Sequence, residues 1–215
     1  MPHAPLPRRQ AGFTLIEIAI VLVIIGLLLG GILKGQELIN SARVKNLASD
    51  FRNIPVFIYG YQDKFRALPG DDVAAATHLS GTPAPTPGNG NGVIEDAWDS
   101  TDNTHESRLF WQHVRMAGLA PGPTNLAAGD FQQRNASGGV LGVQSTPPFT
   151  GMTGTYFICS GGILGRFAKQ LDTQLDNGDT ATGSVMVGTT TVGSPAPLAL
   201  ASVNDSTAYI VCMGI

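Results

Sequence analysis

The sequence predicts an α+β protein in which a long N-terminal α-helix, half transmembrane and half amphipathic, packs on a small antiparallel β-sheet. Three observations support this prediction: an unbroken apolar run near the N-terminus, a helical stripe of apolar residues behind it, and short strand-like segments in the C-terminal half. We expect the helix over residues 13–66, with a membrane-spanning half at 13–33, and a soluble domain over residues 67–215.

The apolar run extends over 21 residues, 13–33, with Thr14 and Glu17 as its only polar side chains. As a helix this run would span about 31 Å, close to the thickness of a bilayer hydrocarbon core. Two arginines at 8–9 lie on its N-terminal side without an acidic residue beside them. The positive-inside rule therefore places the N-terminus in the cytoplasm and the remainder of the chain on the opposite side.

Three other interpretations of this run are less favoured. A secretory signal peptide has an apolar stretch of only about 7–15 residues and a small-residue cleavage site, which residues 30–35 match imperfectly. A plain single-span anchor leaves Glu17 unexplained, because an acidic side chain deep in a bilayer costs about 3 kcal/mol. A buried core helix of a soluble protein has a shorter apolar run than this one.

The string GFTLIE at residues 12–17, followed by the apolar stretch, resembles the N-terminal signature of type IV pilins and type II secretion pseudopilins. The resemblance implies that residues 1–12 are a leader peptide, which a membrane peptidase removes by cutting between Gly12 and Phe13. It also implies that the same enzyme methylates the new amine of Phe13, and that Glu17 is the fifth residue of the mature chain.

The chemistry of Glu17 agrees with this resemblance. A lone buried carboxylate needs a partner, and the cleaved Phe13 amine of a neighbouring subunit is a cation that can supply one. Each subunit would offer an acid and an amine about one helical turn apart. Because such head-to-tail pairing generates an open filament, we predict Phe13 and Glu17 as assembly residues rather than catalytic ones.

The helical pattern continues beyond the apolar run and becomes amphipathic. Apolar residues recur there at spacings of three and four, which places them on one helix face. These residues are Leu47, Phe51, Ile54, Ile58, Tyr61 and Phe65. The string ALPGD at residues 67–71 should end the helix, since Pro and Gly interrupt helical structure.

The glycines of the membrane half form two small-xxx-small pairs, Gly26 with Gly30 and Gly31 with Gly35. Such pairs let helices pack closely, although glycine is also common in membrane helices in general. In many pilins a proline lies in this region and the filament unwinds locally there. This chain has no proline between Phe13 and Ile54, so the glycines would have to supply that flexibility.

An acidic, Asn- and Gly-rich segment raises the question of a calcium site. The string NGNGVIE at residues 89–95 is similar to the middle of an EF-hand loop, but Pro87 and Trp98 stand where its first and last acidic ligands should be. A plain solvated turn is the favoured interpretation and Ca²⁺ the alternative; otherwise no cofactor is expected. The candidate ligands are Asn89, Asn91, Glu95, Asp96 and Asp99.

The C-terminal half alternates short strand-like segments with Gly, Ser and Thr turns. We expect strands at 140–143, 155–159, 184–187 and 208–213, a helix at 163–175, and an earlier short helix at 104–118. This order resembles the C-terminal half of a pilin, a roll in which the sheet packs on the amphipathic part of the long helix. Residues 81–135 are more than that resemblance implies for the connecting region.

The two cysteines, Cys159 and Cys212, both lie in predicted strands. The expected destination is outside the cytoplasm, where disulfides persist, and many type IV pilins have a C-terminal disulfide. We therefore predict a bridge between Cys159 and Cys212, with two buried reduced thiols as the alternative.

Composition narrows the functional classes. The formal net charge is -3 and no basic stripe is present, so nucleic-acid binding is not predicted. The sequence has no P-loop, HExxH or nucleophile-elbow motif, and no enzyme activity is predicted.

We predict a structural subunit of a type IV pilus-like filament, located in the inner membrane as a single-pass protein and then in a surface pilus. Its partners would be further copies in a homopolymer or mixed filament, the prepilin peptidase and N-methyltransferase, and the inner-membrane assembly platform. The alternatives are a pseudopilin of a periplasmic type II secretion pseudopilus, a minor pilin, or, from a different class, a membrane-anchored periplasmic binding domain or enzyme.

Overall fold

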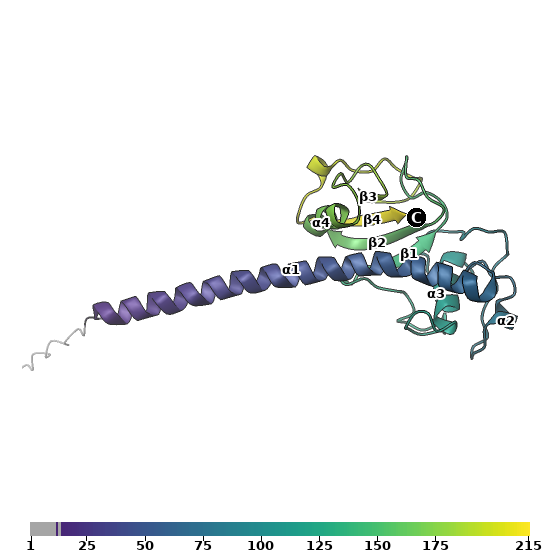
Figure 1. Cartoon of the computed structure of the whole chain (residues 1–215), viewed down its shortest axis with the longest axis horizontal. Coiled ribbons are helices and arrows are strands. Elements are labelled where there is room, and N and C mark those ends of the chain that lie inside the picture. Colours follow the sequence, from purple (N-terminus) through teal and green to yellow (C-terminus); the bar gives the residue numbers. More distant parts are fainter. Residues whose placement is uncertain (1–11, 13) are drawn as a thin grey trace, which may run out of the picture. The chain divides into compact units, whose positions relative to one another are not determined.

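The computed structural model describes residues 12 and 14–215, so most of the expected leader, and Phe13, lie outside the described residues. The chain divides into two compact units, Met1–Ser41 and Ala42–Ile215. Helix α1 (Leu15–Phe65) contributes its first half to one unit and its second half to the other (Figure 1).

The second unit contains the remaining elements. In chain order they are α2 (Ala75–His78), α3 (Glu106–Met116), β1 (Leu141–Gln144), β2 (Phe157–Leu164), α4 (Gly165–Leu175), β3 (Val185–Gly188), a 3₁₀ turn (Leu200–Ser202) and β4 (Ala208–Gly214). A long helix with a small sheet is the α+β architecture that the sequence predicts.

The four strands form one antiparallel sheet in the order β1-β2-β4-β3, with β2 and β4 at the centre. The two cysteines lie directly opposite each other on the central pair, and they form the predicted disulfide. Their Cα atoms are 4.1 Å apart, although the two residues are separated by 53 positions in the sequence. The bridge therefore fastens the last strand of the chain to the middle of the sheet.

The core of the second unit is built on the apolar stripe of α1. Leu47, Phe51, Ile54 and Ile58 are completely buried. They belong to one cluster with residues of α3, α4 and the sheet, and Figure 1 shows this part of α1 beside β1, β2 and α3. Each such side chain contributes about 1.5–3 kcal/mol by leaving water. Of the six predicted stripe residues, these four lie in this cluster, Tyr61 is buried in a smaller separate cluster, and Phe65 is only half-buried.

The sequence prediction for the end of the second strand and the start of the following helix was wrong. Strand β2 continues beyond residue 159 to Leu164, and α4 begins at Gly165 rather than at residue 163. The Ser-Gly-Gly string at 160–162 has the composition of a turn, but in the structure it lies within β2, where the register of pairing with β4 shifts between Ser160 and Ile163. Gly162 takes a φ of 70°, which glycine adopts without strain, and the ladder then resumes at Ile163.

Helix α3 is more deeply buried than its amphipathic pattern suggests, because residues 106–115 are all buried. The loop before β1 wraps around the helix and accepts hydrogen bonds from its arginines. Arg108 Nη2 donates to the Leu126 carbonyl at 2.9 Å, and Arg115 Nη1 donates to the Phe131 carbonyl at 2.7 Å. Burial, and next the nearby Arg108, lower the pKa of Arg115 to about 10, so this guanidinium stays charged at neutral pH. Covering this helix is the structural use of the long 81–135 connection.

A buried polar network holds the C-terminal end of α1. Tyr61 Oη donates to Asp72 Oδ2 at 2.7 Å, and His78 Nδ1 lies 2.7 Å from the same oxygen. The Ala74 amide donates to Asp72 Oδ1 at 2.9 Å. Burial by itself raises the pKa of Asp72, but the bonds from Tyr61, His78 and Ala74 outweigh it and leave this pKa below its usual value.

We expect Asp72→Asn to lower the free energy of unfolding by about 1–3 kcal/mol at neutral pH, because it replaces a charged acceptor that several donors share. Since the folded-state pKa of Asp72 is depressed, its contribution is fully present above the unfolded value of about 3.9 and is lost as the pH falls through the folded value. Denaturation of the full chain at neutral and acid pH should therefore show a difference between wild type and variant that shrinks below about pH 4. An equal difference at both pH values would contradict this account.

Reduction of the disulfide should lower the stability of the second unit by about 4 kcal/mol, because the bridge restricts a long loop of the unfolded chain. Thermal unfolding of the full chain with and without reductant measures this loss. The double variant Cys159→Ala/Cys212→Ala is the control, since its unfolding should not respond to reductant. A wild-type midpoint that stays unchanged after complete reduction would show that the bridge adds no stability.

Candidate processing and assembly site

The first half of α1 presents apolar side chains on all its sides. It includes an 18-residue window with a mean hydropathy of 2.9, none of which is buried within the chain. Leu15 is 92% exposed and Leu27 is 74% exposed. Water-soluble monomers rarely expose so large a continuous apolar surface, so this segment fits a membrane anchor.

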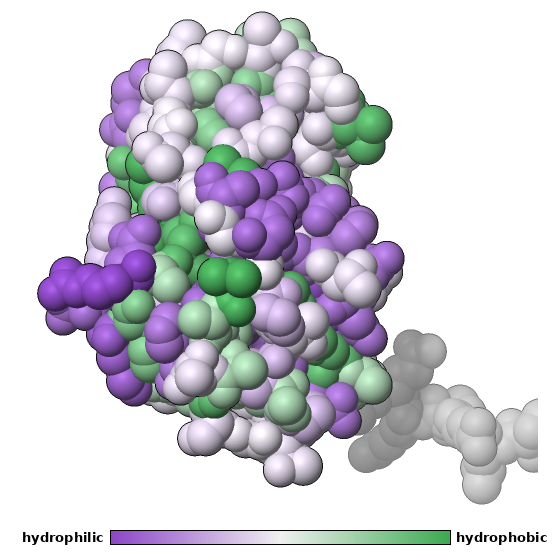
Figure 2. Space-filling model, turned by 90° about the vertical axis from the view of Figure 1, so that its right-hand side faces the viewer, coloured by the Kyte–Doolittle hydropathy of each residue, from purple (hydrophilic) through white to green (hydrophobic). Residues whose placement is uncertain are grey.

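The face of the second unit that carries α2 has a different character. In Figure 2 hydrophobic and hydrophilic residues alternate over this face, and the most hydrophilic ones gather in a band across it. Such a mixed surface is typical of a domain in water. The two units therefore differ in the solvent that their surfaces favour.

Thr14 and Glu17 form a reciprocal cap at the start of α1. Glu17 Oε2 accepts hydrogen bonds from the Thr14 amide at 2.8 Å and the Thr14 hydroxyl at 2.7 Å. In return the Glu17 amide donates to Thr14 Oγ1 at 3.3 Å. This is a capping box, which satisfies amides that the first helical turn leaves unpaired.

Our sequence reasoning missed this role of Glu17, although the signal was present. A Ser or Thr followed three residues later by an acid, directly before an apolar run, is the usual sequence pattern of a capping box. The cap uses only one carboxylate oxygen: within residues 12 and 14–215, no donor reaches Glu17 Oε1. Glu17 can therefore cap its own helix and still offer an oxygen to a cation from outside the chain.

The two glycine pairs in the first half of α1 lie on an unbroken helix. A Cβ atom added at any of these glycines would meet nothing within 4 Å among the described residues. The helix is continuous through these glycines in the single chain, and the unwinding expected in the filament stays a prediction. Their lack of side chains leaves room for the close approach of another helix.

The calcium candidates fall into two groups. In the first group, the side-chain amides of Asn89 and Asn91 each donate to the Glu95 carboxylate at 2.8 Å. The loop that carries them is organised around Asp71, which our sequence reasoning had not singled out. The Asp71 carboxylate accepts hydrogen bonds from the backbone amides of residues 90, 91 and 92 at 2.6, 3.0 and 2.7 Å.

The second group, Asp96 and Asp99, lines a cavity of about 410 Å³ together with threonines 189–191. Over the described part of the chain, no cluster of three or more His, Cys, Asp or Glu side chains is arranged to hold a metal ion. Calcium binding by Asn89, Asn91, Glu95, Asp96 and Asp99 stays a prediction that this arrangement does not test.

Comparison with known proteins agrees with the chemistry of this N-terminus. Residues 7–33 match the family described as the prokaryotic N-terminal methylation motif. The chain thus carries the prepilin signature that type IV pilins and pseudopilins share, as its GFTLIE string suggested. No curated protein matches the chain.

Proposed function

We propose that this protein is a structural subunit of a type IV pilus-like filament. Its leader, residues 1–12, would be removed between Gly12 and Phe13, the new amine of Phe13 would be methylated, and subunits would polymerise through parallel N-terminal helices. The observation that supports this most is the methylation motif at residues 7–33, on a helix whose apolar first half is not buried by any of the described residues.

Glu17 would join neighbouring subunits in this assembly. Its Oε2 is engaged by Thr14 of the same helix, while Oε1 receives no bond from residues 12 and 14–215. The amine released by cleavage is a cation, and a charge-assisted hydrogen bond to a carboxylate is strongest where water is excluded. Cleavage would therefore create the partner that makes a carboxylate tolerable inside a membrane or a filament core.

Partners and location follow from the same proposal. The subunit would enter the inner membrane once, with its N-terminus in the cytoplasm, and would meet the prepilin peptidase and the assembly platform there. The second unit would then face an oxidising compartment, which agrees with the Cys159–Cys212 disulfide. No catalytic role is proposed for the chain itself.

The first test is mass spectrometry of filaments sheared from the surface of the native host. We expect an abundant peptide that begins at methylated Phe13. If the cleaved peptide occurs only in the membrane and periplasmic fraction, the pseudopilin or minor-pilin alternative replaces the pilus. A mature protein whose main peptide still joins Gly12 to Phe13 would overturn all three and leave an anchored periplasmic domain.

A second test separates the charge of Glu17 from its capping role. Glu17→Gln keeps a side chain that can complete a capping box but removes the charge, whereas Thr14→Ala removes the hydroxyl of the cap and keeps the charge. We expect Glu17→Gln to lose most of its filaments and Thr14→Ala to retain them. Filament yield in the host is the readout, with cleavage of each variant checked by mass.

Wild-type assembly by Glu17→Gln would contradict the ion pair between subunits. If Thr14→Ala also failed while it was cleaved normally, the start of the helix rather than the charge would limit assembly.

A further inference from the structure

The sequence contains three Asn-Gly pairs, and all three lie in loops of the second unit. The pairs are 89–90, 91–92 and 177–178. Their glycines take positive φ values of 78°, 91° and 86°, which glycine adopts without strain and other residues rarely adopt. Each asparagine also shapes its loop, because its Oδ1 accepts a hydrogen bond from the backbone amide two residues further along, at 3.0, 3.1 and 2.8 Å. These loops therefore use both members of each pair.

The same dipeptide is chemically labile, since asparagine can lose its side-chain amide and glycine has no Cβ to hinder the ring closure involved. The glycine nitrogen loses its proton and attacks Cγ of the asparagine. A C–N bond forms there, the bond to the side-chain nitrogen breaks, and ammonia leaves with that proton. Water then opens the resulting succinimide ring to aspartate or isoaspartate, so one amide and one water molecule give one carboxylic acid and one ammonia. Because the nitrogen attacks as an anion, a group that opposes negative charge on it slows the reaction.

In each of the three pairs, the glycine amide donates to a buried aspartate. Gly90 N lies 2.6 Å from Asp71 Oδ1, and Gly92 N lies 2.7 Å from Asp71 Oδ2. Gly178 N lies 3.0 Å from Asp172 Oδ1. Asp71 is 4% exposed and Asp172 is completely buried, so neither carboxylate can turn into solvent while the unit stays folded.

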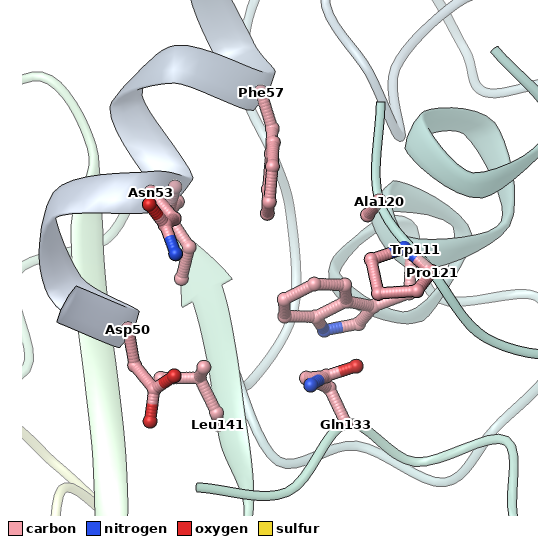
Figure 3. Close-up of a pocket in the computed structure, with 9 residues that line it drawn as sticks. Asp50, Asn53, Phe57, Trp111, Ala120, Pro121, Gln133 and Leu141 are labelled. Atoms are coloured by element: carbon pink, nitrogen blue, oxygen red, sulfur yellow. The ribbon is translucent and has the colours of Figure 1, made fainter. Parts of the chain in front are cut away.

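Buried carboxylate oxygens in this unit do not all hold an amide. Figure 3 shows Asp50 beside a cavity of about 150 Å³, and its buried Oδ2 accepts no hydrogen bond from residues 12 and 14–215. Oδ2 of Asp172 is likewise buried and unpaired, whereas Oδ1 of the same group holds Gly178. The contact of a carboxylate oxygen with each Asn-Gly amide is therefore a specific feature of these loops.

A carboxylate on the glycine N–H opposes the loss of its proton in two ways. The hydrogen bond that the carboxylate accepts is charge-assisted, and it disappears when the proton leaves. The negative charge of the carboxylate also repels the charge that forms on the nitrogen, and this repulsion is stronger at a buried group than in water. Each glycine nitrogen is therefore a poorer nucleophile in the folded chain than in an unfolded one.

We propose that Asn89, Asn91 and Asn177 are latent deamidation sites whose reaction buried carboxylates restrain. Asp71 restrains the reaction at the first two sites, and Asp172 restrains it at the third. This restraint lets the second unit keep the Asn-Gly conformation of its loops without losing the amides. It acts within one chain, so it does not depend on assembly into a filament.

The test incubates the full chain, folded in detergent above neutral pH, and follows the conversion of each asparagine by peptide mass spectrometry. Asp71→Asn removes the charge and should speed conversion at Asn89 and Asn91 about tenfold, because a hydrogen bond to a charged group is lost. The rate at Asn177 should not change in this variant. Asp172→Asn should speed conversion at Asn177 about tenfold and leave the other two sites unchanged, so each variant is the control for the other.

Two further variants separate the charge on the glycine amide from the order of the loop. Glu106 accepts the backbone amides of Asn89 and Glu95 at 2.9 and 3.1 Å. Asp176 accepts those of residues 184–185 at 2.7 and 3.0 Å. Glu106→Gln and Asp176→Asn therefore weaken bonds in the same two loops but leave the Asn-Gly amides on their carboxylates. Both should convert at the wild-type rate.

Three results would overturn the proposal. If the reduced and denatured chain converts these asparagines no faster than the folded chain, there is no latent reactivity to restrain. Unchanged or slower conversion in folded Asp71→Asn and Asp172→Asn would show that the carboxylates do not restrain it. Equal acceleration by Glu106→Gln and Asp176→Asn would show that loop order, rather than charge, protects the amides. If Asp71→Asn does not fold, Asp172→Asn with its control Asp176→Asn decides the question.

Discussion

The packing of one face of α1 against α3 and the sheet holds the second unit together. Leu47, Phe51, Ile54 and Ile58 leave water completely, and α3, α4 and all four strands contribute residues to the same cluster. A small sheet with short edge strands has little stability by itself, so it needs a helix to cover its apolar face. The disulfide adds a second constraint, because it joins the last strand to the strand at the centre of this sheet.

The two halves of α1 differ in how their apolar side chains are distributed around the helix. In the second unit α1 has one apolar face, whereas in residues 15–33 it is apolar on every side except at Glu17. A helix satisfies its own backbone hydrogen bonds, so this segment can leave water without an unpaired peptide group in its interior. Its first turn lacks such internal partners, and the Thr14–Glu17 cap supplies them. A residue that a simple anchor does not explain thus has a structural use even before any neighbouring subunit is considered.

Most polar groups inside the second unit have hydrogen-bond partners within the unit. Asp72 collects several donors at the end of α1, Asp71 collects the amides of its loop, and the arginines of α3 donate to loop carbonyls. Five buried side-chain atoms among the described residues have no hydrogen-bond partner, and Arg115 Nε is one of them.

The sequence by itself determined the features that depend on neighbouring residues. The unbroken apolar run identified the first half of α1, helical periodicity identified its second half, and the GFTLIE string identified the processing signature. Each of these signals lies within a few turns of chain. Only the tertiary structure decided the extension of β2 through Gly162, the burial of residues 106–115 of α3 and the place of Asp71 at the centre of a loop about twenty positions away. Those features arise from contacts between segments far apart in the chain, which local propensity does not encode.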